Sequence, residues 1–377
     1  MARDEPDNDA WSVTVVPDSS VASAASAPRM PEVPGNGRSR SLVVAAAVGI
    51  PISVVFLVLA IRGTDLGGVL STLAGVRPLP LLGAVACMGV VYWVQAARWR
   101  RIADTGLGQR RFVEMVVAGL AVNNVLPGRV GDLLRARWVS RGAYSGGRGL
   151  ATVMLDRAFD ILALVAFLLL SLPLVTDEGW VDRIVVGSVL VLAVVWALIL
   201  AARSYTRRRP RSRRAHRGLP RRFLRDTLEG LSDPLSVERG LLWFGMSVLA
   251  WGAWAVAAIL VGRAVGVELS LVDAVFVTAA LNLGVAIPSS PGFVGTYQWL
   301  GVSALALFGI GREEGLAFAI CMQAVWYVPT TIVGAVILVA HAKGAWRSGQ
   351  VFDFGSSPAV GGGVRLKSDT GAPRPTT

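Results

Sequence analysis

The sequence predicts an all-α protein that crosses a membrane many times, with about eight transmembrane helices and one or two further helices broken at prolines. Of its 377 residues, 53% are hydrophobic and only 16% are charged, against about 25% charged residues in a soluble domain. A membrane span needs about 20 apolar residues, and several windows of that size carry no charge. These windows are residues 42–61, 79–97, 184–202, 240–262 and 315–340.

The distribution of arginine predicts the orientation of the chain. Basic residues follow the second window, from Arg98 to Arg111, and the loop 203–239 is rich in arginine, whereas the turn after Leu174 is mostly acidic. Because loops rich in Arg and Lys stay in the cytoplasm, we expect the N-terminus and both basic segments to be cytoplasmic in a cell-membrane protein. The loop 203–239 is either a plain determinant of topology or a patch that binds anionic lipid.

A central membrane domain, residues 41–342, is expected between two tails. Residues 1–40 are rich in Ala, Ser, Pro and acidic groups, and residues 343–377 end in a stretch rich in Gly, Pro and Ser. Both tails are therefore expected to be disordered. The net charge of +12 lies in the loops, and no segment resembles a nucleic-acid-binding module, so no nucleic-acid partner is expected.

Catalytic chemistry has little support in the sequence. The two cysteines, Cys87 and Cys321, fall inside predicted spans, and the two histidines, His216 and His341, are far apart. We therefore expect no disulfide framework and no metal site, no cofactor and no enzymatic activity. No Walker motif indicates use of ATP, and the sequence carries no signal for the oligomeric state.

Two short apolar segments, 115–128 and 274–287, end at prolines. A helix of 14 residues reaches about 21 Å, less than the roughly 30 Å of the hydrocarbon core. Each segment follows an acidic residue and carries an asparagine nine positions after that acid. The match is consistent with an inverted repeat, and paired broken helices mark binding sites in transporters. The alternative is coincidence, because asparagine and proline are common at helix ends.

Charged residues beside the first break form the core of the predicted substrate site. Arg129, Asp132 and Arg135 are three apart and would share a helical face, as would Asp156 and Asp160, which are four apart. Ionisable groups within spans often mark a substrate path, and the planar fork of arginine suits phosphate. The alternative is that these charges only pair with one another. The expected binding residues are Asn123, Asn124, Pro127, Arg129, Asp132, Arg135, Asp156, Arg157, Asp160, Asn282, Pro288, Ser289, Ser290, Pro291, Gly292, Gly295, Gln298 and Tyr327.

The second break, residues 288–295, is rich in proline, serine and glycine. We expect irregular backbone there, either binding an oxygen-rich headgroup through hydroxyls and amides or forming a tight corner without a ligand. Gln298, Gln323 and Tyr327 are further polar groups in apolar surroundings. Each would line the site or bond to a neighbouring helix.

Three motifs occur in order: Asn123 to Asp132 fits N-x-x-x-P-x-R-x-G-E, residues 156–160 fit E-R-x-x-D, and residues 288–295 fit P-x-x-P-G-x-x-G. Together they resemble the lysylphosphatidylglycerol synthase transmembrane family, also called flippase-like membrane proteins, over roughly residues 40–342. Two aspartates replace the usual glutamates, and Gln298 stands near where many members carry Glu, which weakens a role in proton coupling. Only a short tail follows the last window, so aminoacylation of lipid is not expected.

The resemblance implies translocation of a lipid or lipid-linked headgroup, with a phospholipid or a polyprenyl-phosphate-linked lipid as partner. A second reading is a membrane glycosyltransferase or its accessory, with Asp65 or the pair Asp177 and Glu178 as candidate acids. A third is a scaffold that transports nothing and recruits a partner through the loop 203–239.

The number of spans depends on how the broken segments run. If only the first is re-entrant, about eight spans remain and the C-terminus is cytoplasmic. If both are re-entrant from opposite sides, about seven remain and the C-terminus lies outside. Basic residues after Ala342 favour the first arrangement.

Overall fold

The computed structural model describes residues 51–126, 129–140, 145–175, 236–285 and 290–348, with a few residues between 186 and 230. All of them belong to one compact unit, residues 41–377. The predicted tail 1–40, most of the loop 203–239 and the end of the C-terminal tail lie outside the described residues.

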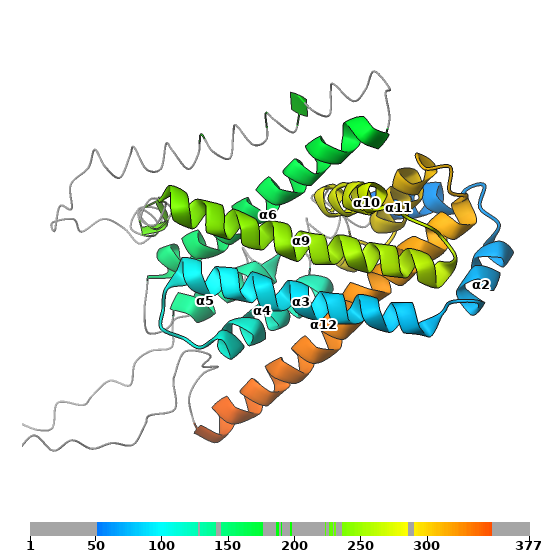
Figure 1. The fold of residues 1–377 in the computed structure, drawn as a ribbon. Coiled ribbons are helices and arrows are strands. Elements are labelled where there is room, and N and C mark those ends of the chain that lie inside the picture. The colour runs from blue at the N-terminus through cyan, green and yellow to red at the C-terminus, as the bar shows by residue number, and fades with distance from the viewer. Residues whose placement is uncertain are drawn as a thin grey trace, which may run out of the picture. The chain divides into compact units, whose positions relative to one another are not determined.

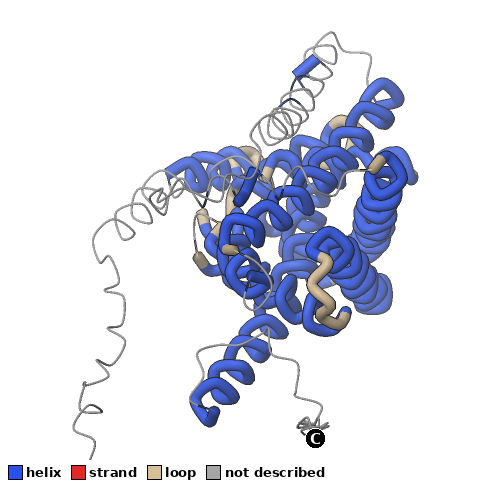
Figure 2. Tube along the Cα trace, turned by 90° about the vertical axis from the view of Figure 1, so that its left-hand side faces the viewer, coloured by secondary structure: helices blue, strands red, loops and turns tan. Residues whose placement is uncertain are grey.

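Every element in the described part of the chain is helical, as predicted (Figure 2). The elements are α2 (Leu66–Ala74), α3 (Pro78–Ala103), α4 (Gln109–Val125), α5 (Val130–Ser140), α6 (Gly146–Val175), α9 (Val237–Val265), α10 (Leu271–Gly284), η1 (Pro291–Phe293), α11 (Thr296–Ala306) and α12 (Arg312–Ser348). Within this part, α3, α6, α9 and α12 are long and apolar enough to cross a membrane. A helix over Pro51–Ile61 and α2 meet at 85° and make a fifth candidate if they form one span. The predicted window 184–202 lies largely outside the described residues.

The central packing joins α3 to α9, which lie side by side along the bundle, and α6 contacts both (Figure 1). Fully buried Ala250, Ala257 and Ala258 of α9 share one apolar cluster with Ala84 and Met88 of α3. Small side chains let helix backbones approach closely, and such packing drives helix association within a membrane.

The helices α4 and α5 fold back on each other, and we call the pair hairpin 1. The backbone amide of Gly131 donates a 2.7 Å hydrogen bond to the side-chain oxygen of Asn123. A Cβ atom on Gly131 would lie 1.9 Å from the carbonyl oxygen of Gly119. Further along α5, the side chain of Arg135 also lies against Gly119. The two helices are therefore antiparallel and touch backbone to backbone.

The helices α10 and α11, with η1 between them, form hairpin 2. The chain turns where Gly292 has a φ of 73°, a left-handed value that glycine adopts at little cost. Beyond the turn, Gly284 lies against Leu300, and Leu281 lies against Gly301. These contacts show that α11 returns along α10 instead of continuing away from it.

Hairpin 1 lies against the C-terminal half of α12. Near the start of α4, the guanidinium of Arg111 is 3.1 Å from the ring of His341. Near its end, the amide of Asn124 donates to the hydroxyl of Thr330 at 3.2 Å. Thus α4 runs antiparallel to α12, from its C-terminal end to its middle.

Hairpin 2 lies against the N-terminal half of α12. Gln298, early in α11, hydrogen-bonds Gln323, and Gly301 packs against Ala319. Therefore α11 runs from the middle of α12 towards its N-terminal end. The two hairpins approach from opposite ends of α12, and η1 of hairpin 2 contacts α4 of hairpin 1.

Close backbone contact in hairpin 1 gives a test of stability. The change Gly131→Ala would drive a methyl group into the Gly119 carbonyl and should cost about 1–3 kcal/mol or more, as overpacking does. The thermal unfolding midpoint of the purified protein in detergent should fall clearly. Gly89→Ala is the matched control, because a Cβ there meets nothing within 4 Å. Equal midpoints for the two variants would contradict the hairpin.

Candidate functional site

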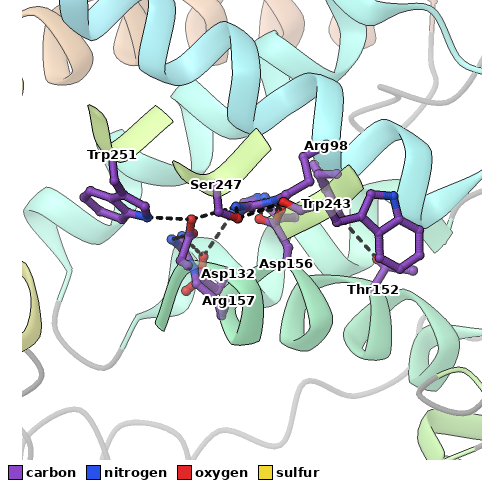
Figure 3. Close-up of polar contacts among 11 residues, drawn as sticks. Arg98, Asp132, Thr152, Asp156, Arg157, Trp243, Ser247 and Trp251 are labelled. Atoms are coloured by element: carbon purple, nitrogen blue, oxygen red, sulfur yellow. Dashed lines mark hydrogen bonds and ion pairs between the residues drawn. The ribbon is translucent and has the colours of Figure 1, made fainter. Parts of the chain in front are cut away.

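A cluster of arginines and aspartates joins hairpin 1 to the helix bundle (Figure 3). Its members, which we call the charge cluster, are Arg98 of α3, Asp132 and Arg135 of α5, and Asp156, Arg157 and Asp160 of α6. Three positive and three negative charges balance when all six groups are ionised. The cluster therefore has no net charge of its own.

Arg98 forms the centre of the charge cluster and is fully buried. Its guanidinium donates to Asp156 at 2.8 and 2.9 Å and to Asp160 at 2.8 Å. It also hydrogen-bonds the hydroxyl of Ser247 on α9, and Trp251 of the same helix donates to Asp160 at 3.1 Å. A buried charge is tolerated only when it is paired and hydrogen-bonded, and Arg98 meets that condition through two other helices.

Arg135 carries α5 into the same cluster. Its side chain is 2% exposed and donates to the second oxygen of Asp156 at 3.0 Å. The guanidinium also lies 4.3 Å from the ring centre of Trp99, a favourable cation–π arrangement. Trp99 is held by a hydrogen bond of its indole nitrogen to Thr152 of α6, at 3.1 Å.

Arg157 and Asp132 form the open edge of the cluster. Their side chains are 27% and 15% exposed, and they are 3.0 Å apart. A longer contact of 3.5 Å joins Arg157 to Asp160. Asp132 also contacts Arg135 at 3.5 Å, so its carboxylate faces two guanidinium groups.

Arg129 lies just before α5 and is exposed. Its φ of 54° is left-handed, so it precedes the helix and does not share a helical face with Asp132 and Arg135 as the spacing predicted. Because the charge cluster is neutral, Arg129 gives this edge an excess positive charge.

The tip of hairpin 1 is tied to the middle of α12. The side chain of Asn124 donates to Thr330 and Thr331 at 3.2 and 2.9 Å, and the backbone carbonyl of Asn124 accepts from Tyr327 at 3.4 Å. Tyr327 also lies against Gly292 of hairpin 2. One aromatic side chain thus contacts both hairpin tips.

Neutral side chains hold the second break. The amide of Gly295 donates to Gln298 at 2.6 Å, Gln298 donates to Gln323, and Gln323 donates to the carbonyl of Gly292 at 2.5 Å. The amide of Ser290 donates to Ser53 at 2.7 Å. These bonds satisfy backbone groups that a broken helix leaves free, which is the bonding role that the sequence left open for both glutamines.

The structure brings most predicted residues of the first break together and separates some of the others. Asn282 donates to the carbonyl of Thr278 in its own helix. At the first break, Asn123 and Asn124 bond to groups outside α4 instead, so the asparagines of the two halves do not match. The backbone of Pro291 belongs to η1. Pro127, Pro288 and Ser289 lie outside the described residues.

Sequence reasoning missed Arg98. It was assigned to the cytoplasmic basic flank, but α3 continues to Ala103 and Arg98 is buried within it. Two aspartates of α6 neutralise the charge and make burial possible. The available signal was its position directly after the apolar window 79–97.

Breaking the charge cluster should destabilise the protein strongly. Asp156→Asn would leave Arg98 and Arg135 buried without their shared carboxylate, and such changes cost about 3–5 kcal/mol. The expected result is a large fall in the thermal midpoint, or loss of monodisperse protein in detergent. Arg110→Gln, at a side chain that is 92% exposed, should change little. A normal midpoint for Asp156→Asn would show that the cluster does not hold α5 and α6 together.

Known proteins are similar in sequence to most of this chain. A UPF0104 membrane protein of Methanothermobacter thermautotrophicus is 24% identical over 77% of this chain and 94% of its own length. The UPF0104 membrane protein PH1989 of Pyrococcus horikoshii is 23% identical over 70% of this chain and 88% of its own. Glycosyltransferase AglD of Haloferax volcanii is 27% identical over 78% of this chain, which spans only 54% of that protein.

The sequence also matches the family described as the lysylphosphatidylglycerol synthase TM region, over residues 43–334. That range contains hairpin 1, the charge cluster, hairpin 2 and most of α12. The resemblance inferred from the three motifs is confirmed. The chain is a multi-pass membrane protein that belongs to the lysylphosphatidylglycerol synthase transmembrane-region family.

Proposed function

We propose that the protein moves a phosphate-bearing lipid headgroup, of a phospholipid or a polyprenyl-phosphate-linked lipid, across the cell membrane. The unequal exposure of its arginines carries this proposal. Arg98 and Arg135 are buried and paired with aspartates, whereas Arg157 and Arg129 are the more exposed arginines at the edge of the cluster. Two accessible guanidinium groups suit phosphate, which accepts paired hydrogen bonds from the arginine fork.

The two hairpins supply a route for the headgroup. Backbone that breaks within a membrane must be buried in protein or line a water-filled cavity, and paired broken helices mark binding sites in transporters. Because the hairpins approach α12 from opposite ends, we propose that hairpin 1 enters from the cytoplasmic face and hairpin 2 from the outer face. The headgroup would pass between their tips, beside Tyr327, while its acyl or polyprenyl chain stays in lipid.

This route revises the expected topology. The expected count of about eight spans treats α10 and α11 as two separate passes. If they form one hairpin that enters and leaves on the same side, these two passes are lost and about six spans remain. Both termini are then cytoplasmic, since an even number of spans returns the chain to its starting side. This orientation agrees with the basic residues after Ala342 and with a cytoplasmic loop 203–239. We propose that this loop contacts anionic lipid.

Sugar transfer is a second candidate, raised by the name of the Haloferax relative. Asp65, one proposed acid, accepts hydrogen bonds from Gly67 and Gly68 at 2.9 and 3.1 Å and caps α2. Both of its oxygens therefore have a structural use. Asp177 and Glu178 lie outside the described residues. Transfer of sugar to a polyprenyl phosphate, abolished by Asp65→Asn, would favour this alternative.

Removing the accessible guanidinium tests the transport proposal. Vesicles containing the purified protein and fluorescent phosphatidylglycerol or polyprenyl phosphate should show protein-dependent movement of the headgroup between leaflets. Arg157→Gln should slow that movement at least about tenfold, because one bidentate phosphate contact is lost and tenfold corresponds to about 1.4 kcal/mol.

Arg137→Gln is the matched control for this experiment. Arg137 is an exposed arginine on α5 outside the charge cluster, and its loss changes the net charge by the same amount. We expect it to transport at the wild-type rate. Equal rates for both variants, or no headgroup movement above empty vesicles for either lipid class, would contradict the proposal.

A further inference from the structure

The three arginines of the charge cluster differ in their freedom to change partners. Arg98 is fully buried and bonded to two aspartates and a serine. Arg135 is held between Asp156 and the face of Trp99. Both are therefore fixed parts of the helix packing.

Arg157 is held more loosely. Its contact with Asp160 is 3.5 Å long, and its buried Nε atom, like that of Arg135, has no hydrogen-bond partner among the described residues. Within the described part of the chain, the one short contact of Arg157 is the 3.0 Å hydrogen bond to Asp132. The Arg157 side chain is 27% exposed, against 0% for Arg98 and 2% for Arg135, so of these three arginines it is the one that an anion from outside would reach.

Asp132 occupies the place that such an anion would take. A carboxylate and a phosphate accept from a guanidinium in the same forked geometry. The Asp132 carboxylate is itself partly exposed at 15%, and its other contact, with Arg135, is 3.5 Å long. Rotation of this one side chain would release Arg157 without moving α5, which Gly131 and Arg135 still anchor.

We propose that Asp132 is an internal stand-in for the substrate phosphate, bound to Arg157 in the empty protein and displaced when a phosphate headgroup arrives. This inference rests on the proposed function and explains how a headgroup leaves again. A site that is occupied by its own carboxylate for most of the time binds an outside ligand more weakly, in proportion to the fraction of open sites. Return of Asp132 to Arg157 then assists release.

Removal of the competing carboxylate provides the test. Asp132→Asn keeps the shape of the side chain but loses its charge, so Arg157 becomes available. Titration of the full-length protein in detergent with glycerol 3-phosphate, followed by calorimetry, should give a dissociation constant about tenfold lower than wild type, equivalent to about 1.4 kcal/mol. Asp132→Glu, which retains a carboxylate within reach of Arg157, should stay within about twofold of wild type.

Glu114→Gln is the matched control for long-range charge. Glu114 lies on the other arm of hairpin 1, its side chain is also 15% exposed, and it too pairs with arginines. The affinity of the Glu114→Gln protein for glycerol 3-phosphate should equal that of wild type. If Asp132→Asn does not yield folded protein, Asp132→Ser removes the same carboxylate and should show the same tightening.

The outcomes separate this inference from the proposed function. Suppose that the wild-type protein binds glycerol 3-phosphate and that Arg157→Gln abolishes this binding. If removal of the Asp132 carboxylate then fails to tighten it, the stand-in is overturned while the phosphate site at Arg157 still holds. Tightening in Glu114→Gln equal to that in Asp132→Asn would also overturn it, because net charge alone would then explain the effect. No binding in wild type or in any folded Asp132 variant would overturn both.

Discussion

The paired contact of Asp156 with Arg98 and Arg135 is the interaction on which the rest of the structure depends. One oxygen accepts from Arg98 of α3 and the other from Arg135 of α5, so a single carboxylate on α6 joins three helices. Ionised groups away from water are costly unless they are paired, and removal of any one member would leave a buried charge. This constraint fixes hairpin 1 against the bundle. Arg157, which adds a more exposed contact to Asp132 of the same hairpin, and Arg129 lie at the edge of the cluster.

The two hairpins have similar paths and different chemistry. Hairpin 1 carries charged residues and packs backbone to backbone at Gly119 and Gly131, whereas the break in hairpin 2 is closed by the neutral pair Gln298 and Gln323. The ends of both hairpins near the breaks are bonded to the same stretch of α12, between Gln323 and Thr331. Under the proposed function, a headgroup that passes between the tips would meet arginine on the side of hairpin 1 and α6 and neutral amides on the side of hairpin 2.

The sequence predicted the parts of this arrangement that local chemistry determines. Segment length and proline located both breaks, because helices end where a backbone donor is lost, and the spacing of Asp156 and Asp160 placed both on the face that binds Arg98. The return of α11 along α10 was not predicted, since it depends on Gly284 meeting Leu300 sixteen residues later. The burial of Arg98 depends in the same way on carboxylates from another helix. Contacts between distant segments leave no periodic signal in one sequence.

The most direct test of the account is the side of the membrane on which each hairpin begins and ends. With Cys87 and Cys321 replaced by serine, single cysteines at Arg110 and Ser145 flank hairpin 1, and cysteines at Leu271 and Leu307 flank hairpin 2; all four positions are exposed. Labelling of sealed, oriented vesicles with a membrane-impermeant maleimide should modify the first two from the cytoplasmic side only and the last two from the outer side only. Labelling of the cysteines at positions 110 and 145 from opposite sides would show that hairpin 1 crosses the membrane. Labelling of all four cysteines from one side would show that the two hairpins do not enter from opposite faces.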